Sequence, residues 1–121
     1  MQKNIETYVA EASTNFKRGT TEMLLLSLLS QGEQYAYELS KTLKEQSRGL
    51  FDIQGPSLYT ALYRLQERGH VATREEQVGR RIRVYYRLLP QGEEYLRLLR
   101  QEYCAVSRGI QAVLENSKEE A

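Results

Sequence analysis

Five side chains able to hydrogen-bond to a nucleic acid recur along one short stretch of this 121-residue chain. They are hydroxyls, phenols and one guanidinium, carried by Ser57, Tyr59, Thr60, Tyr63 and Arg64. Hydroxyls and phenols donate and accept hydrogen bonds, and a guanidinium binds either a phosphate or the edge of a guanine. On a helix these groups would share one face, which would suit a DNA groove. The plainer interpretations of that face are a solvated polar surface or a protein-binding surface.

A helix from Pro56 to Gly69 would position these groups. Pro56 suits the first helical position, where a missing N–H costs nothing, and Gly69 suits a left-handed helix stop. At helical spacing the apolar residues of the stretch fall on the opposite face, which we expect to be buried: Leu58, Ala61, Leu62 and Leu65.

A second cationic group follows this helix. Residues His70–Glu76 and Arg81–Leu88 alternate as strands do, and the glycine-containing link Gln77–Arg80 predicts a hairpin. Arg80, Arg81 and Arg83 would lie at or near its tip. They could neutralise phosphates or enter a minor groove, although an ordinary charged loop has the same composition.

The local distribution of charge favours nucleic-acid binding, whereas the net charge of the chain does not. The chain has a net charge of only +1, but residues 64–87 hold seven arginines against three acidic residues, so any affinity for DNA must come from this region. The single cysteine excludes an intramolecular disulfide and fits a reducing cytosol. No apolar run reaches membrane-spanning length and no signal-peptide core is evident, so we expect a cytoplasmic protein.

Catalysis has little support in the sequence. We find no nucleophile with a neighbouring base, no phosphate-binding loop, no paired buried carboxylates and no metal-ligand spacing around His70. We therefore expect neither an enzyme nor a cofactor or metal site.

The sequence before this stretch predicts three helices, at 2–16, 20–31 and 35–47. The second is apolar enough to lie at the centre of the fold. Leu50–Ile53 reads as an extended connector that could pair as an edge strand. Tyr37 and Lys41 on the third segment are further candidates for DNA contact. The helix order followed by a hairpin predicts a mainly α (α+β) fold, a winged helix-turn-helix with a two-stranded wing and a long C-terminal helix.

The last helix, from Pro90, carries a heptad seam that predicts association with a second copy of the chain. The residues of the seam are Leu96, Leu99, Tyr103, Val106, Ile110 and Val113. We expect the helix over 2–16 to assist this homodimer, and the end of the chain, from residue 116, to be frayed.

Four motifs, in order and with the expected spacing, resemble those of PadR-like transcriptional regulators. They are Tyr35–Leu39, Ser57–Leu65, Glu67–Gly69 and the pair Gly79–Arg81 with Tyr85–Leu88. The single terminal helix resembles the short-tailed branch of that family. The resemblance implies a dimeric repressor on an inverted-repeat operator in double-stranded DNA. It also implies an N-terminal helix at 1–18, a DNA-binding domain at 19–89 and a dimerisation helix with its tail at 90–121. The alternative is a winged-helix protein-interaction module without DNA binding.

The same resemblance implies an effector site at the dimer interface. Tyr103 matches the position at which drug-sensing members stack planar apolar compounds, with Phe16, Met23 and Ser107 nearby. The alternative role for Tyr103 is packing between the two subunits. Its neighbour Cys104 reads as a small buried hydrophobe, with redox sensing as the alternative.

Overall fold

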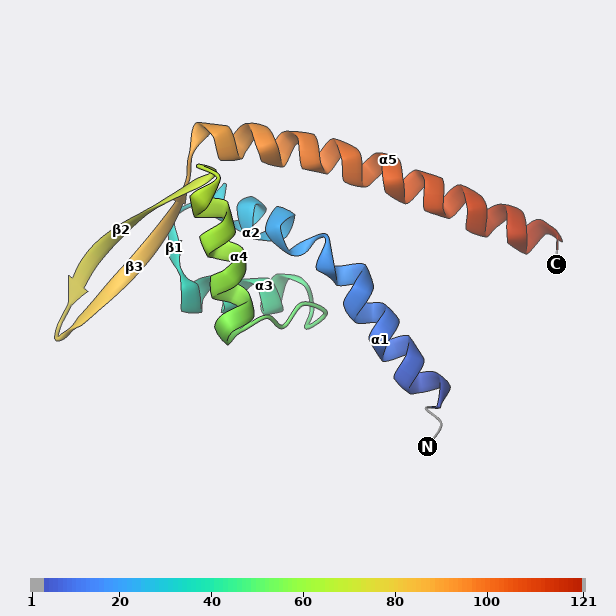
Figure 1. Cartoon of the computed structure of the whole chain (residues 1–121), viewed down its shortest axis with the longest axis horizontal. Coiled ribbons are helices and arrows are strands. Elements are labelled where there is room, and N and C mark those ends of the chain that lie inside the picture. The colour runs from blue at the N-terminus through green and yellow to red at the C-terminus, as the bar shows by residue number, and fades with distance from the viewer. Residues whose placement is uncertain (1–3, 121) are drawn as a thin grey trace.

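The computed structural model describes residues 4–120, and it confirms the predicted fold class: a small helical domain with a wing and a long terminal helix (Figure 1). In chain order the elements are α1 (Ile5–Arg18), α2 (Thr21–Leu29), β1 (Gln34–Tyr35), α3 (Ala36–Gln46), α4 (Gly55–Glu67), β2 (Val71–Val78), β3 (Arg81–Leu88) and α5 (Pro90–Glu120).

The apolar helix α2 lies at the centre of the domain, as its composition predicts. It contributes four buried leucines and contacts α3, α4, α5 and β3. Leu39, Leu62 and Leu65 from α3 and α4 are fully buried against it. Burying a leucine side chain contributes roughly 1.5–3 kcal/mol, so these residues supply much of the energy that holds α4 in place.

The sheet has three antiparallel strands in the order β1-β3-β2. The third strand is not Leu50–Ile53, so that expectation is wrong: β1 pairs instead with β3, placing Gln34 opposite Tyr86. The connector has no strand geometry because its groups are used locally. Phe51 and Ile53 pack against the core, and the Phe51 N–H donates to the Ser47 hydroxyl at 2.9 Å.

The predicted hairpin is present: its second strand has the predicted bounds, its first strand extends to Val78, and its turn is tighter than the sequence suggested. Val78 pairs with Arg81, which leaves only Gly79 and Arg80 in the turn. Gly79 has φ +63°, as the first central residue of a type II′ turn requires. β2 and β3 therefore run out from the domain as a narrow wing (Figure 1).

The predicted stop of α4 is confirmed, and its start lies one residue before the predicted one, at Gly55. Pro56 lies in its first turn, and Gly69, with φ +78°, ends it. The N–H of Gly69 donates to the Gln66 carbonyl at 3.0 Å and that of His70 to the Leu65 carbonyl at 2.9 Å. This pair of bonds is the Schellman motif, which satisfies the last carbonyls of the helix.

Helices α1 and α5 project from the same side of the domain (Figure 1). α1 has no buried residue, and the predicted start of this helix at residues 2–3 lies outside the described part of the chain. α5 begins at Pro90 as predicted but stays helical to Glu120, beyond the point at which we expected fraying; Ala121 lies outside the described residues. No helix within residues 4–120 is both long and apolar enough to cross a membrane.

Candidate nucleic-acid interface

Helix α4 exposes the face that the sequence assigned to DNA. Its apolar stripe is buried, and its polar side chains are exposed: Ser57, Tyr59, Thr60, Tyr63 and Arg64. The position of the stripe places Thr60 and Tyr63 near the middle of the exposed face, with Tyr59 and Arg64 on its two flanks. The structure thus brings the five predicted residues together on one surface, and their contact with DNA stays a prediction.

Arg64 is not free in this structure, because it is paired with Glu22 of α2. One carboxylate oxygen of Glu22 lies 3.0 Å from Arg64 Nη1, and the other lies 3.2 Å from Arg68 Nη1. The sequence analysis did not indicate that Glu22 pairs with Arg64 and Arg68. Glu22 is 42 residues from Arg64, so only the packing of α2 on α4 reveals the pair.

The other flank of α4 joins α3. Tyr37, Lys41 and Tyr59 line a shallow groove of about 360 Å³ between the two helices. Lys44 and Asp52, at 3.6 Å from each other, lie at the same groove. Three residues predicted separately from two segments are therefore neighbours.

The wing separates its three predicted arginines. Arg80 and Arg81 are exposed at or beside the turn, whereas Arg83 lies nearer the domain with its guanidinium 4.5 Å from the centre of the Tyr35 ring. A hydrogen bond with Tyr85 raises the pKa of Arg83. Arg83 thus fixes the base of the wing against β1 and leaves the tip to Arg80 and Arg81.

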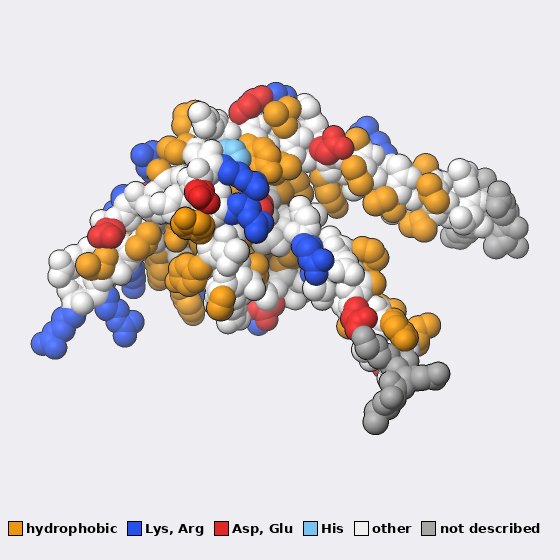
Figure 2. Space-filling model, in the orientation of Figure 1, with side chains coloured by type: hydrophobic (Ala, Val, Ile, Leu, Met, Phe, Trp, Pro, Cys, Tyr) orange, Lys and Arg blue, Asp and Glu red, His pale blue; other side chains and the backbone are white. Residues whose placement is uncertain are grey.

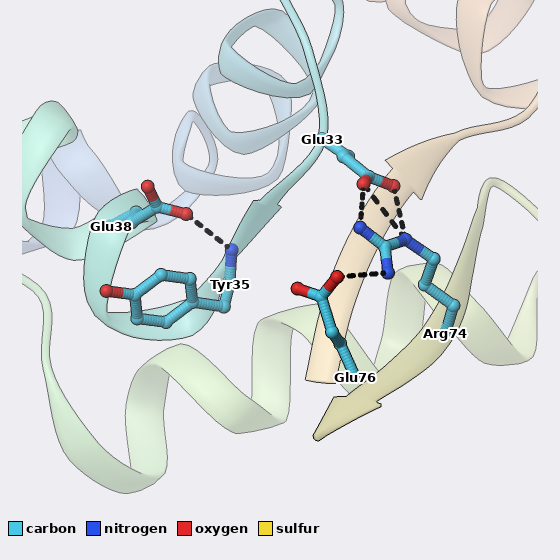
Figure 3. A network of polar contacts seen from close by, with 5 residues as sticks. All are labelled: Glu33, Tyr35, Glu38, Arg74 and Glu76. Atoms are coloured by element: carbon cyan, nitrogen blue, oxygen red, sulfur yellow. Dashed lines mark hydrogen bonds and ion pairs between the residues drawn. The ribbon is translucent and has the colours of Figure 1, made fainter. Parts of the chain in front are cut away.

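A network that the sequence did not indicate joins strand β2 of the wing to Glu33, directly before β1 (Figure 3). Arg74 Nε donates to both Glu33 carboxylate oxygens, at 2.9 and 3.1 Å, and Arg74 Nη1 lies 3.6 Å from Glu76. The hydrogen bond from Arg74 lowers the pKa of Glu33. The same guanidinium lies 4.5 Å from the centre of the Tyr85 ring, a cation–π contact that adds to the ion pairs.

The network continues into α3. Tyr35 and Tyr85 pack edge to face, with ring centres 5.6 Å apart. The Tyr35 N–H donates to the Glu38 carboxylate at 3.1 Å (Figure 3). Tyr37 stacks on Tyr35 with ring centres 6.4 Å apart. The orientation of the wing and the start of α3 are therefore set by one connected group of side chains.

The predicted dimer seam divides into two parts. Leu96, with 6% of its surface exposed, belongs to the core of its own subunit, and Leu99 packs against that core. The later seam residues are about half exposed or more: Tyr103, Val106, Ile110 and Val113. Leu96 therefore has little surface left for a partner, while the seam from Tyr103 onwards is available.

The four predicted effector residues come from three helices. Phe16 on α1 is 80% exposed, Met23 on α2 is half-buried against the core, and Tyr103 and Ser107 lie on α5. None of the four lines either of the grooves that flank α4. Because the predicted effector site requires a second copy of the chain, a single subunit does not test whether these four residues act together. Their role in effector binding stays a prediction.

Three packed helices, a two-stranded wing and an exposed polar face on the third of these helices define a winged helix-turn-helix domain. Residues 25–98 match the transcriptional regulator PadR-like family, and the chain belongs to that family. Its members are DNA-binding transcriptional regulators. The chain is thus a transcriptional regulator of this type.

Solved structures and a curated relative agree with this assignment. A PadR family transcriptional regulator from Eggerthella lenta is 29% identical with a TM-score of 0.84, over 91% of this chain and 95% of that one. A transcriptional regulator from Clostridium thermocellum is 30% identical with a TM-score of 0.76, over 80% and 95%. The transcriptional regulator YqjI of Escherichia coli is 27% identical over 80% of this chain, which spans only 45% of that longer protein.

Proposed function

We propose that this chain is a homodimeric repressor of the short-tailed PadR branch that binds an inverted-repeat operator. Residues 19–89 would bind DNA, and residues 1–18 and 90–121 would join the two subunits. The observation that carries the proposal is the exposed polar face of α4, flanked by Arg64 on one side and by Tyr37, Lys41 and Tyr59 on the other.

In this proposal α4 enters the major groove. Thr60 and Tyr63, at the middle of its exposed face, reach base edges, and the flanking side chains contact the two phosphate strands. Arg80 and Arg81 at the wing tip bind phosphates of the adjacent groove, and Arg83 supports them from the base. With a net charge of +1, the chain depends on these local cations for its affinity.

The second copy is proposed from the unpaired apolar faces of α1 and α5. Figure 2 shows hydrophobic side chains along both projecting helices. Ile5, Val9 and Phe16 on α1 and the later seam residues of α5 are all at least half exposed. An exposed stripe of this length marks an association surface, and a symmetric dimer would cover it. The dimer would then hold the two α4 helices about one DNA turn apart.

Effector release is proposed from Tyr103 and its position on α5. In a symmetric dimer, two copies of Tyr103 would face the interface and could stack on a planar apolar compound, with Phe16, Met23 and Ser107 around it. Binding there would favour one separation of the two α4 helices and so alter DNA affinity. Release of the operator by such a ligand is the repressor mechanism we propose.

Anisotropy titrations of a duplex from the neighbourhood of the gene, at several salt concentrations, test the DNA-binding assignment. The Arg80/Arg81/Arg83→Ala variant should lose most of its affinity, and the slope of log K against log salt should fall by about 0.9 for each phosphate that is no longer neutralised. Arg64→Ala should also bind more weakly. Arg97/Arg100/Arg108→Ala on α5 removes the same charge away from α4 and should bind like the wild type.

Size-exclusion chromatography with light scattering would accompany these titrations, to establish that the variants keep the oligomeric state of the wild type. Unchanged binding by the wing variant would refute the assignment of these residues. A wild-type chain that binds no duplex even at low salt would instead be a winged-helix protein-interaction module.

A further inference from the structure

A second groove flanks α4 on the side away from α3, and we call it the α1–α4 groove. It has a volume of about 730 Å³ and is lined by the end of α1, the start of α2, the connector 49–54 and the first half of α4. Ser57, Thr60 and Arg64 form the α4 wall, and Lys17 and Arg18 come from the last turn of α1. The groove therefore continues the proposed DNA-binding face onto a helix that lies outside the family match at 25–98.

The two acidic residues of this groove already have partners. Glu22 pairs with Arg64 and Arg68, at 3.0 and 3.2 Å. Asp52 accepts a hydrogen bond from Gln54 at 2.9 Å and lies 3.6 Å from Lys44, and both interactions lower the pKa of Asp52. Both carboxylates of the groove are therefore already paired with cations outside α1.

Lys17 and Arg18 are the cations of the α1–α4 groove that have no acidic partner among the described residues. Within residues 4–117, no carboxylate lies within 4.0 Å of either side chain. Lys17 Nζ instead lies 5.8 Å from the centre of the Phe51 ring, in the wall of the groove. Figure 2 shows Lys and Arg side chains over α1 and over the adjoining part of α4 on the same face of the molecule.

We propose that Lys17 and Arg18 bind the phosphate backbone of the DNA strand that flanks α4 on this side. The inference rests on the proposed function, since it needs α4 in a major groove. A helix in a major groove has a phosphate strand along each flank. Tyr37 and Lys41 of α3 lie on the flank of α4 that would face one strand. The unpaired cations of α1 lie on the flank that would face the other. A polyanion is the partner that this groove fits, because its own carboxylates are neutralised and two positive charges remain.

The experiment compares the Lys17→Ala/Arg18→Ala double variant with the wild type in the salt-titrated duplex assay. We expect its affinity to fall by about tenfold or more at low salt, with a salt slope smaller by about 0.9 for each phosphate that is no longer neutralised. Lys17→Arg/Arg18→Lys keeps both charges and should restore binding. Arg97→Ala/Arg100→Ala on α5 is the matched control and should bind normally.

The outcomes separate this inference from the proposed function. If the wing variant loses binding while the α1 double variant keeps the wild-type affinity and slope, this inference fails and the proposed function stands. If the double variant weakens binding only because it dissociates the dimer, which light scattering detects, the inference also fails. If neither variant alters binding, or the wild type binds no duplex, both the proposed function and this inference fail.

Discussion

Gly92 lies directly against the backbone of His70: a Cβ atom at Gly92 would be 2.1 Å from the His70 carbonyl oxygen. That oxygen also accepts a hydrogen bond from the Leu89 N–H at 3.0 Å. The His70 ring stacks on Tyr95 with ring centres 4.3 Å apart. The end of α4 and the start of α5 are thus in close contact around one residue. In a dimer formed through α5, this junction would set the position of α4 relative to its symmetry mate.

Gly92→Ala should therefore destabilise the fold. A methyl group at this position overlaps backbone atoms that cannot rotate away, and such overpacking costs about 1–3 kcal/mol, more than the helix propensity gained from alanine. Urea unfolding measures the change. Gly109→Ala in the same helix is the control, since nothing lies within 4 Å of a Cβ there, and its free energy of unfolding should stay level or rise slightly. Equal effects of the two substitutions would contradict the close contact.

His70 should make the protein less stable in mild acid. Burial, and next the charge of Arg68, lower the pKa of His70 in the folded state, with Glu22 opposing. Its Nδ1 is buried and has no hydrogen-bond partner among the described residues, so a proton there would find no acceptor in that part of the chain. Because the folded pKa is below the unfolded one, the stabilisation is present above the ordinary pKa and is lost as the pH falls through the folded value.

The measurement is the free energy of unfolding between about pH 7.5 and pH 5, a window in which histidine titrates and ordinary carboxylates stay ionised. The wild type should lose stability across it. His70→Phe keeps the stacking on Tyr95 and removes the titrating group, so its stability should vary less. An identical pH dependence in the two proteins would show that His70 is not responsible.

Arg48 offers a stabilising substitution. It is the one described residue other than glycine with positive φ, at +56°, where it ends α3. The N–H of Gly49 donates to the Lys44 carbonyl at 2.8 Å, which completes the helix stop. Arg48→Gly should raise the free energy of unfolding by roughly 0.5–1 kcal/mol, because the backbone strain is removed. Arg48→Ala keeps the strain and should give no such gain in the same denaturation experiment.

Ile110→Glu tests the proposed dimer seam. Ile110 is 54% exposed in one subunit, and we expect a partner to cover it. A carboxylate buried twice in a symmetric interface should dissociate the dimer, because a charge without a partner is costly to desolvate. Light scattering would then report a monomer. Gln101→Glu places the same charge on the opposite face of α5 and should leave the dimer intact; dissociation by both variants would contradict the seam.

Much of the fold could be predicted because its signals are local. The apolar spacing and terminal residues of α4, the glycine in the wing turn and Pro90 at the start of α5 each act over a few residues. The edge strand could not be found in this way. Gln34–Tyr35 is only two residues long, and its strand geometry comes from pairing with β3 some 50 residues later.

The same distinction between local and long-range signals applies to the candidate site. The exposed face of α4 follows from helical periodicity, so its polar residues could be predicted from the sequence. The partners of those residues could not: Glu22 reaches Arg64 and Arg68 only because α2 packs beside α4. Leu96 fits the heptad pattern as well as its neighbours do, yet the domain core buries it, because periodicity does not say whether an apolar face meets its own chain or another.

The central claim is that two copies of α4 bind DNA as a pair. It is tested most directly by selecting binding sites from a pool of random duplexes with the 121-residue chain and sequencing them. We predict enrichment of an inverted repeat whose half-sites are centred about 10 base pairs apart, one turn of DNA. Enrichment of a single asymmetric site, or of no sequence at all, would contradict the claim that two α4 helices bind DNA as a pair.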